Sequence, residues 1–254
     1  MPLWSYSGKD WQTVNLHKKE NGLSAFLCGG GPSLNLVNPS FLNGPNRLVF
    51  GLNNTYPTLK PDYWIGMDDA DCYDARLFWE PFPKILRGNY GDSLCKGFKL
   101  KNLNNTLFAD VVNYEDSMDI FDLNESTKFC WPKNTFAFAL QFIMWMGIKN
   151  IYLFGVDLNN EESDYFDGNY LNKSQKDYNA LLYDQLFMFL KRFKEKAEPL
   201  GYNIISCSHG SRINSLFEYR HYMDVIKYLE IDVPYGRIKK HVLDDKESNN
   251  SSGG

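Results

Sequence analysis

The chain has 254 residues, of which 43% are hydrophobic and 16% aromatic, so it can build one large α/β domain with a real core and is not an intrinsically disordered chain. Its formal net charge of −4 supplies no overall basic field, and we therefore expect no nucleic-acid partner bound by bulk electrostatics. Five scattered cysteines without a CxxC pair indicate a cytoplasmic protein, and no apolar run reaches the roughly 18 residues that a membrane span needs.

The first predicted strand, residues 23–28, runs into a glycine-rich turn from Gly29 to Ser33. Glycine is used where the backbone must approach something closely, but this turn matches neither GxGxxG nor a P-loop. Two interpretations stay open. The glycines pack the turn against a neighbouring strand, or the N–H groups of Gly30, Gly31 and Ser33, with the Ser33 hydroxyl, cradle an anion or a ribose.

Strands and helices alternate along the rest of the chain. We predict strands at residues 47–52, 62–67, 107–112, 151–154 and 202–206, and helices that begin at Asn134 or Thr135, at about 176 and at about 215. This alternation predicts an α/β fold with an open, mostly parallel Rossmann-like sheet and helices on both faces. We expect a single domain over residues 1–242, followed by a disordered polar tail, residues 243–254.

In sheets of this kind, ligands bind beyond the carboxyl ends of the strands. Small or polar residues follow five of the predicted strands, where a purely structural sheet end would more often carry apolar side chains. These residues are the glycine turn, Asn53 and Asn54, Asp68 and Asp69, Asp157, and the serine-rich segment 206–211. The sequence therefore predicts a ligand crevice at this edge.

Three blocks of the sequence resemble the bacterial sialyltransferases and the related DUF115 and motility-accessory-factor proteins. They are CGGGPSL, FGLNNTY and NTFAFALQFIMWMGIKNIYLFGVDL, and a weaker fourth is YNIISCSHGSRI. The blocks span roughly residues 23–215, although residues 60–130 align by position alone. The resemblance implies a glycosyltransferase with a nucleotide-activated, CMP-sialic acid-like donor, a glycan or other hydroxyl acceptor, and no required cofactor or metal.

The resemblance also implies which residues bind the nucleotide. The glycine turn would hold it, Asn53 would touch its ribose or phosphate, and Thr135 and Tyr165 would contact the phosphate. Asp157 would anchor the loop after the middle strand. The implied nucleotide-binding residues are Gly29, Gly30, Gly31, Pro32, Ser33, Asn53, Thr135, Asp157 and Tyr165.

The chain departs from the family pattern at its catalytic groups. The family's arginine is replaced in a stretch where Lys133 offers only a point charge, and the histidine base after the middle strand is missing. A carboxylate can replace a histidine as base, so Asp164, Asp167 and His209 are the candidate catalytic residues. For His209, a capping or solvent-exposed role before the last helix is the alternative, and the sequence favours it.

Two other functions fit the sequence. One is a diphosphokinase of the 6-hydroxymethylpterin type, which would use ATP and Mg²⁺, with Asp68, Asp69 and Asp71 as metal ligands unless they form a solvated loop. The other is a catalytically silent nucleotide-binding module. The oligomeric state does not follow from the sequence.

Overall fold

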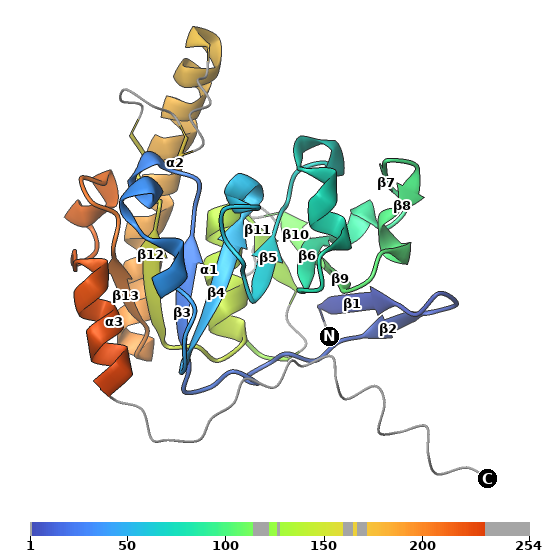
Figure 1. Ribbon diagram of the computed structural model, residues 1–254, viewed down its shortest axis with the longest axis horizontal. Helices are drawn as coiled ribbons and strands as arrows, with labels where there is room; N and C mark the ends of the chain where they lie inside the picture. The colour runs from blue at the N-terminus through green and yellow to red at the C-terminus, as the bar shows by residue number, and fades with distance from the viewer. Residues whose placement is uncertain (1, 114–121, 126–127, 160–164, 167–171, 232–254) are drawn as a thin grey trace.

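The computed structural model describes residues 2–113, 122–125, 128–159, 165–166 and 172–231. The predicted tail, residues 243–254, lies outside them. Within the described chain a nine-stranded sheet forms the centre of the molecule (Figure 1). Its strands, in spatial order, are β13 (Asn203–Ser206), β12 (Asn150–Phe154), β3 (Ser24–Cys28), β4 (Arg47–Leu52), β5 (Tyr63–Ile65), β6 (Lys84–Arg87), β9 (Thr106–Ala109), β1 (Leu3–Tyr6) and β2 (Trp11–Thr13).

Seven neighbouring strands of this sheet, from β13 to β9, run parallel, and β1 pairs antiparallel with both β9 and β2. The predicted mostly parallel Rossmann-like sheet is therefore confirmed. We call the side on which the seven parallel strands end the carboxyl edge, and the side on which they begin the amino edge. The N-terminal hairpin of β1 and β2 extends the sheet beyond β9, and Trp11 packs edge-on against Phe108, with ring centroids 5.3 Å apart.

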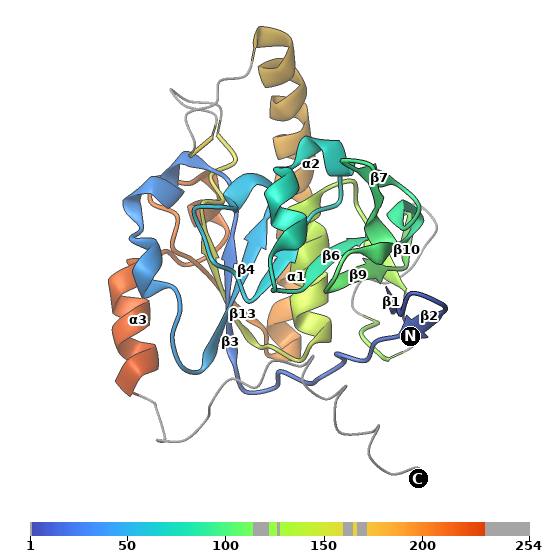
Figure 2. The ribbon, with the colours of Figure 1, turned by 45° about the vertical axis from the view of Figure 1, so that its right-hand side comes forward.

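Helices cover both faces of the sheet, as predicted (Figure 2). Side chains alternate between the faces of a strand, so Leu27 and Leu153 pack with α1 (Thr135–Trp145) and α2 (Lys173–Ala197). Phe26 and Phe154 face the other way and pack with α3 (Tyr222–Ile231). The central strands are buried on both faces, which explains why they read as continuous apolar runs.

Helix α1 begins where the sequence predicts. The Asn134 side chain accepts a hydrogen bond from the Ala137 N–H at 3.1 Å, and so caps the first turn. The helix ends ahead of Gly147, whose φ of +90° is easily adopted only by glycine. Every residue of α1 is buried, so this helix is a fixed support for whatever lies at its N-terminus.

The prediction of one strand over residues 107–112 is wrong. Two strands occupy this region: β9 lies in the large sheet, while β10 (Val111–Asn113) pairs with β11 (Phe129–Trp131). Asp110 separates them. Its N–H donates to the Pro2 carbonyl at 2.7 Å and its carboxylate lies 3.2 Å from the Lys128 ammonium, so the chain leaves the large sheet at this residue.

The prediction of a helix over residues 215–229 is wrong in its first half. After a short turn at Arg212–Ser215, the chain runs beside β13, because the Ser206 N–H donates to the Glu218 carbonyl at 2.8 Å and the Arg220 N–H donates to the Ser206 carbonyl at 2.9 Å. Helix α3 starts only at Tyr222. These backbone pairs outweigh the helical pattern of the sequence.

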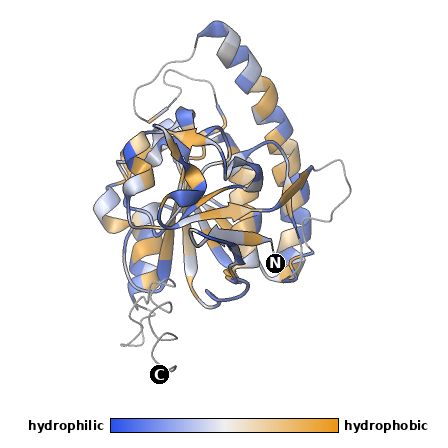
Figure 3. Ribbon diagram, turned by 90° about the vertical axis from the view of Figure 1, so that its right-hand side faces the viewer, coloured by the Kyte–Doolittle hydropathy of each residue, from blue (hydrophilic) through white to orange (hydrophobic). Residues whose placement is uncertain are grey.

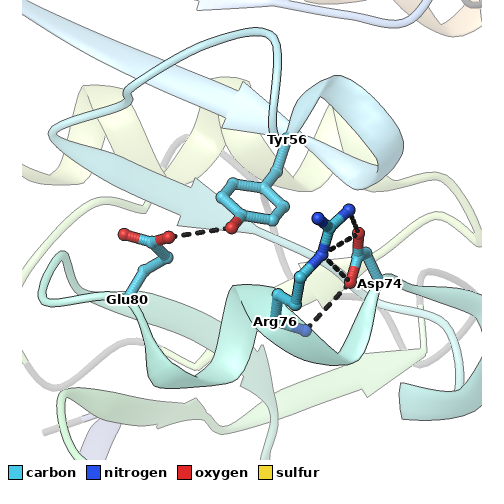
Figure 4. A network of polar contacts seen from close by, with 4 residues as sticks. All are labelled: Tyr56, Asp74, Arg76 and Glu80. Carbon is cyan, nitrogen blue, oxygen red and sulfur yellow. Dashed lines mark hydrogen bonds and ion pairs between the residues drawn. The ribbon is translucent and has the colours of Figure 1, made fainter.

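Short helical turns follow several of the strands, and a small hairpin, β7 (Leu94–Cys95) and β8 (Phe98–Lys99), lies beside β6 and β9. Near the start of β6, the Tyr56 hydroxyl donates to the Glu80 carboxylate at 2.8 Å, and Arg76 forms an ion pair with Asp74 (Figure 4). The 3-10 turns are Pro32–Leu36, Pro39–Phe41, Asn53–Thr55, Ala70–Cys72, Ala75–Trp79, Gly88–Tyr90, Leu100–Asn102, Glu198–Leu200 and Arg212–Ser215.

Candidate functional site

A cleft of about 370 Å³ opens at the carboxyl edge of the sheet. The chain builds β4, β5, β6 and β9 on one side of β3 and returns through α1 to place β12 on the other side, so the strand order reverses between β3 and β12. Open α/β sheets bind their ligands at such a reversal. The cleft is lined by Gly29, Gly30, Gly31, Pro32, Leu52, Asn53, Asp68, Trp131, Lys133, Asn134, Thr135, Phe136, Gly155, Val156, Asp157, Leu158, Asn159, Tyr165, Asn179, Leu182, Tyr183 and Leu186.

Two of the three glycines serve packing. A Cβ atom on Gly29 would lie 2.6 Å from the Gly155 carbonyl oxygen, and one on Gly31 would lie 2.8 Å from the same atom. The Gly31 N–H donates to that oxygen at 2.8 Å, and the Ser33 N–H donates to Asp157 Oδ2 at 2.8 Å. The interpretation in which the N–H groups of Gly31 and Ser33 are free to cradle an anion is therefore wrong, because both already have partners.

The middle glycine is different. A Cβ atom on Gly30 would meet only the Tyr165 and Phe166 rings, at 3.7 and 3.9 Å, which is ordinary contact. The Gly30 carbonyl accepts a hydrogen bond from the Phe166 N–H at 3.0 Å and so holds Tyr165 at the mouth of the cleft. The turn therefore packs on β12 through its outer glycines and presents Gly30 to the ligand space.

Asp157 is the main acceptor group of this wall. It is buried, with 6% of its surface exposed; its Oδ2 accepts from Ser33, while its Oδ1 has no partner. Burial raises the pKa of the Asp157 carboxyl, and the hydrogen bond from Ser33 opposes that rise. Buried carboxylate oxygens are nearly always hydrogen-bonded in native proteins, so Asp157 Oδ1 can still accept a hydrogen bond from a ligand or a water molecule.

The serine-rich segment after β13 holds this wall in place. Ser208 Oγ accepts from the Val156 N–H at 2.9 Å, and Ser211 Oγ donates to the Val156 carbonyl at 2.5 Å. The Asp157 carbonyl accepts from the Arg212 N–H at 3.0 Å. These serines fix the backbone of Asp157 from behind. His209, in the same segment, is exposed, lies 3.4 Å from the Tyr219 hydroxyl through Nδ1, and is not among the residues that line the cleft.

The opposite wall is the N-terminus of α1. Lys133, Asn134, Thr135 and Phe136 line the cleft there, and the first N–H groups of an α-helix have no partner inside the helix. Together with the helix dipole and the exposed Lys133 ammonium, they favour a negatively charged group. Asp157 and the α1 N-terminus thus offer acceptors and donors to one cleft.

A third set of polar groups follows β4 and β5. Asn53 has the left-handed φ of +47°, and its carbonyl accepts from the Trp64 indole N–H at 2.8 Å. The Tyr73 hydroxyl lies 3.5 Å from Asn53 Oδ1 and 3.4 Å from Asp68 Oδ2, and it accepts from the Asp68 N–H at 2.9 Å. Asp68 is exposed and lines the cleft. It is the carboxylate that this side of the cleft offers to a ligand.

Unpartnered buried atoms gather at the carboxyl edge. Within the described residues, six buried side-chain atoms lack a hydrogen-bond partner, and only Arg47 Nη1 among them lies at the amino edge. The other five lie at the end of β6 or in the segments that follow β3, β4, β12 and β13: Arg87 Nε, Ser33 Oγ, Thr55 Oγ1, Asp157 Oδ1 and Asn214 Oδ1.

The structure brings together eight of the nine residues that the sequence assigns to the nucleotide; the ninth, Ser33, lies beneath the turn as the partner of Asp157. Asp164 and Asp167 lie outside the described residues. Asp68 faces the cleft, but the described residues contain no group of three or more His, Cys, Asp or Glu side chains placed to hold a metal ion. The contribution of α2, through Asn179, Leu182, Tyr183 and Leu186, was missed, because its amphipathic pattern is the same as that of any helix packed on a sheet.

No protein-family model and no curated protein matches the chain. Its structural neighbours are sialyltransferases. The chain is similar to the sialyltransferase CstII from Campylobacter jejuni in complex with cytidine-5′-monophosphate, with 12% identity and a TM-score of 0.44 over 78% of this chain and 84% of that one. It is also similar to the monofunctional α-2,3-sialyltransferase Cst-I from the same organism, with 13% identity and a TM-score of 0.44 over 87% and 99% of the two chains.

A third similar structure is CST-II in complex with a trisaccharide acceptor and CMP, with 12% identity and a TM-score of 0.45 over 77% of this chain and 85% of that one. At these values the likeness is distant. No helix among the described residues is both long and apolar enough to cross a membrane.

Proposed function

We propose that this protein is a glycosyltransferase that binds a nucleotide-activated sugar, with CMP as the nucleotide and a sialic acid-like sugar, in the cleft at the carboxyl edge. The observation that carries the proposal is the pairing of the two walls. A nucleotide has ribose hydroxyls that donate hydrogen bonds and a phosphate that accepts them. The cleft offers an unpartnered acceptor, Asp157 Oδ1, on one wall and the N-terminus of α1 with Lys133 on the other.

This arrangement orients the donor. The nucleoside lies against Gly30 and Asp157, and the phosphate lies at the N-terminus of α1, where Thr135 is the first helical residue. Tyr165 closes over the glycine turn on the nucleoside side. The sequence blocks that resemble the sialyltransferases support this orientation, because the residues they assign to the donor come from distant parts of the chain and meet in one cleft.

The transfer step follows from that orientation. The acceptor hydroxyl oxygen forms a bond to the anomeric carbon of the sugar, the bond from that carbon to the phosphate oxygen breaks, and the electron pair leaves with CMP. The N-terminus of α1 and Lys133 stabilise the negative charge that grows on the departing phosphate. The acceptor proton passes to a carboxylate that acts as general base.

Asp68 is the described carboxylate best placed to be that base. It is exposed, it lines the cleft, and its carboxylate is held near the Tyr73 hydroxyl at 3.4 Å. Asp157, in contrast, is buried and already accepts from Ser33. Asp164 and Asp167 remain candidates from the sequence. Turnover of the Asp68→Asn, Asp164→Asn and Asp167→Asn variants at saturating donor separates them, since loss of a general base costs about 10²–10⁴-fold in rate.

Calorimetric titration with CMP and with ATP, each with and without Mg²⁺, tests the proposal, together with transfer from CMP-sialic acid to a mixture of glycosides. We expect CMP to bind without Mg²⁺ and sugar to be transferred. ATP binding that requires Mg²⁺ would favour the diphosphokinase, and CMP binding without any transfer would favour a silent nucleotide-binding module.

A further inference from the structure

The first half of helix α2 extends beyond the body of the molecule. The helix has 25 residues, so at the rise of an α-helix it is about 37 Å long. Figure 1 shows its first half rising past the carboxyl edge of the sheet. Its second half is buried in the core through Leu186, Leu190, Phe193 and Ala197. The core therefore accounts for one face of α2 and leaves the opposite side uncovered.

A second apolar stripe runs along the uncovered side. Tyr178, Leu181 and Met188 are 63%, 57% and 53% exposed, and Gln185 between them is exposed as well. These four residues, which we call the α2 stripe, are spaced by 3, 4 and 3 positions, which is the a and d spacing of a coiled coil. On a helical wheel they fall about 130° away from the buried face. Figure 3 shows hydrophobic and hydrophilic residues alternating along this projecting part of the helix.

The spacing indicates what the stripe binds. Large apolar side chains that are exposed singly need no explanation, but a regular row of them on one helix fits the grooves of another helix with the same row. Of the three α-helices that the described residues form, α1 is buried along its whole length and α3 exposes one large apolar side chain, Tyr228. Only α2 carries such a row, so the matching surface is found on α2 of a second copy.

Two copies of α2 match when they run antiparallel about a two-fold axis. Tyr178 then lies opposite Met188 of the other copy, and Leu181 lies opposite Gln185, so the pair has four layers. In an antiparallel coiled coil, an a residue faces a d residue in each layer, and the stripe supplies both kinds. The same face stays exposed further along the helix, at Arg192, so the second helix has room to lie there.

The charges beside the stripe favour this orientation. Asp177 of one copy lies next to Lys191 of the other, and the two-fold axis makes this ion pair twice. Asp184 approaches its own symmetry mate, but each copy neutralises it through Arg212, 2.6 Å away. A parallel pair would instead place Lys191 against Lys196 of the other copy, which is a repulsive contact.

We propose that the α2 stripe is a dimerisation surface and that its occupant is α2 of a second copy of this chain, packed antiparallel. An interface of four helical layers is small among specific interfaces, so the dimer forms in the micromolar range. The inference does not depend on the proposed function. Because α2 also lines the cleft at the carboxyl edge, the two clefts of the dimer share one pair of helices.

A charge placed in the middle of the stripe tests the proposal. Leu181 is exposed and does not line the cleft, so Leu181→Asp disturbs neither the core nor the nucleotide site. Leu200 is 50% exposed and lies beyond the end of α2, off the stripe, so Leu200→Asp is the matched control. Sedimentation equilibrium from micromolar to several hundred micromolar protein measures the dissociation constant. We expect the wild type and Leu200→Asp to dimerise equally, and Leu181→Asp to dimerise about tenfold more weakly or less.

An exchange of charges tests the orientation. Asp177→Lys brings like charges together at both ends of the antiparallel pair and should weaken the dimer, and adding Lys191→Asp to the same chain should restore it. A wild type that stays monomeric, or a dimer that Leu181→Asp leaves unchanged, would overturn the proposal. Binding of monomeric wild type, but not of Leu181→Asp, to phosphatidylglycerol vesicles would also overturn it, because the stripe would then face a lipid surface. A dimer that the charge exchange does not restore would overturn the antiparallel arrangement.

Discussion

The two edges of the sheet treat buried polar groups in opposite ways, and strand β6 shows both. At its start, the Lys84 side chain is fully buried, and its ammonium donates to the Glu80 carbonyl at 2.6 Å. At its end, Arg87 is held between two aromatic rings, and its Nε is buried without a partner. The same short strand therefore has a satisfied cation at the amino edge and an unsatisfied donor at the carboxyl edge.

The rest of the sheet follows this pattern. Arg47, at the start of β4, donates through Nε and Nη2 to the carbonyls of Phe41, Leu42 and Asn43, at 2.9 to 3.1 Å, and only its Nη1 is left without a partner. At the carboxyl edge, Asp157 keeps one oxygen unpartnered although the strand before it is fully paired. Buried cations at the amino edge thus hold loops in place, whereas at the carboxyl edge Asp157, which lines the cleft, keeps an acceptor that a ligand can reach from there.

The largest effect is expected from a side chain inside the glycine turn. A Cβ atom on Gly31 would lie 2.8 Å from the Gly155 carbonyl oxygen and 2.9 Å from Asp157 Cγ, so Gly31→Val must push the turn off β12. We expect the free energy of unfolding to fall by about 3 kcal/mol. Gly30→Ala is the control, with an expected change within about 0.5 kcal/mol. Urea denaturation of both variants measures this, and equal costs would mean that the turn does not pack as described.

The buried lysine at the amino edge predicts how the stability of the protein depends on pH. Burial lowers the pKa of Lys84 to about 8, so between pH 8 and the ordinary lysine pKa the unfolded chain binds a proton that the folded chain does not. The contribution of Lys84 to stability therefore rises with pH across this window, by about 3 kcal/mol in total. Lys84→Met removes this contribution.

Urea denaturation of wild type and Lys84→Met, repeated from pH 7 to 10.5, isolates the effect from that of other titrating groups. The stability of the wild type relative to the variant should increase with pH. A difference in the free energy of unfolding that does not change with pH would show that Lys84 stays charged in the folded protein. Lys84 would then no longer support the contrast between the two edges.

The unpartnered oxygen of Asp157 predicts selectivity for a ribose. Asp157→Asn keeps the shape and can still accept from Ser33, but the amide NH₂ that then replaces Oδ1 cannot accept from a hydroxyl. Losing a hydrogen bond to a charged acceptor costs about 1.5–3 kcal/mol, so CMP should bind about 10- to 100-fold more weakly. The 2′,3′-dideoxy analogue of CMP should bind wild type and variant alike. Calorimetry of both proteins with each of the two ligands tests this prediction. Equal losses of affinity for both ligands would show that Asp157 does not contact the ribose.

The smallest effect is expected at Lys133. Its exposed ammonium adds to the helix terminus, so Lys133→Ala should weaken CMP binding by about 0.5–1 kcal/mol, with the loss shrinking as salt rises toward 1 M. Cytidine, which has no phosphate, should be unaffected. Lys227→Ala, at an exposed position on α3, is the control. If cytidine and CMP respond alike, the phosphate does not lie at this wall.

Much of the fold follows from the sequence, because the central strands are apolar on both faces and α1 carries its own cap and stop. The crevice at the carboxyl edge also follows, since small or polar residues stand after successive strands. The break at Asp110 could not be predicted, because it depends on the N-terminus of the chain. The Pro2 carbonyl, just before β1, accepts a hydrogen bond from the Asp110 N–H. The late start of α3 likewise depends on β13, because Tyr219, just before the helix, pairs with Ser206 of that strand. The helical pattern of the sequence contains no sign of this pairing.

The site shows the same division. Residue types at strand ends predicted where Asn53 and Asp157 would lie, but not which atoms would be left free. The Ser33 N–H donates to Asp157 over a separation of 124 residues, and this single contact turns Ser33 from a ligand-binding candidate into a support. Contacts of that kind depend on tertiary geometry, which local propensity and spacing do not contain.

The position of β12 has a consequence for how the protein is made. Ser24 on β3 pairs with Asn150, 126 positions later, so the wall that carries Asp157 cannot join the glycine turn until most of the chain has left the ribosome. Closing so long a segment is slow, and β3 must wait beside β4 with its other side unpaired. The cleft is therefore among the last parts of the molecule to form, and CMP binding during synthesis would report that the chain has finished folding.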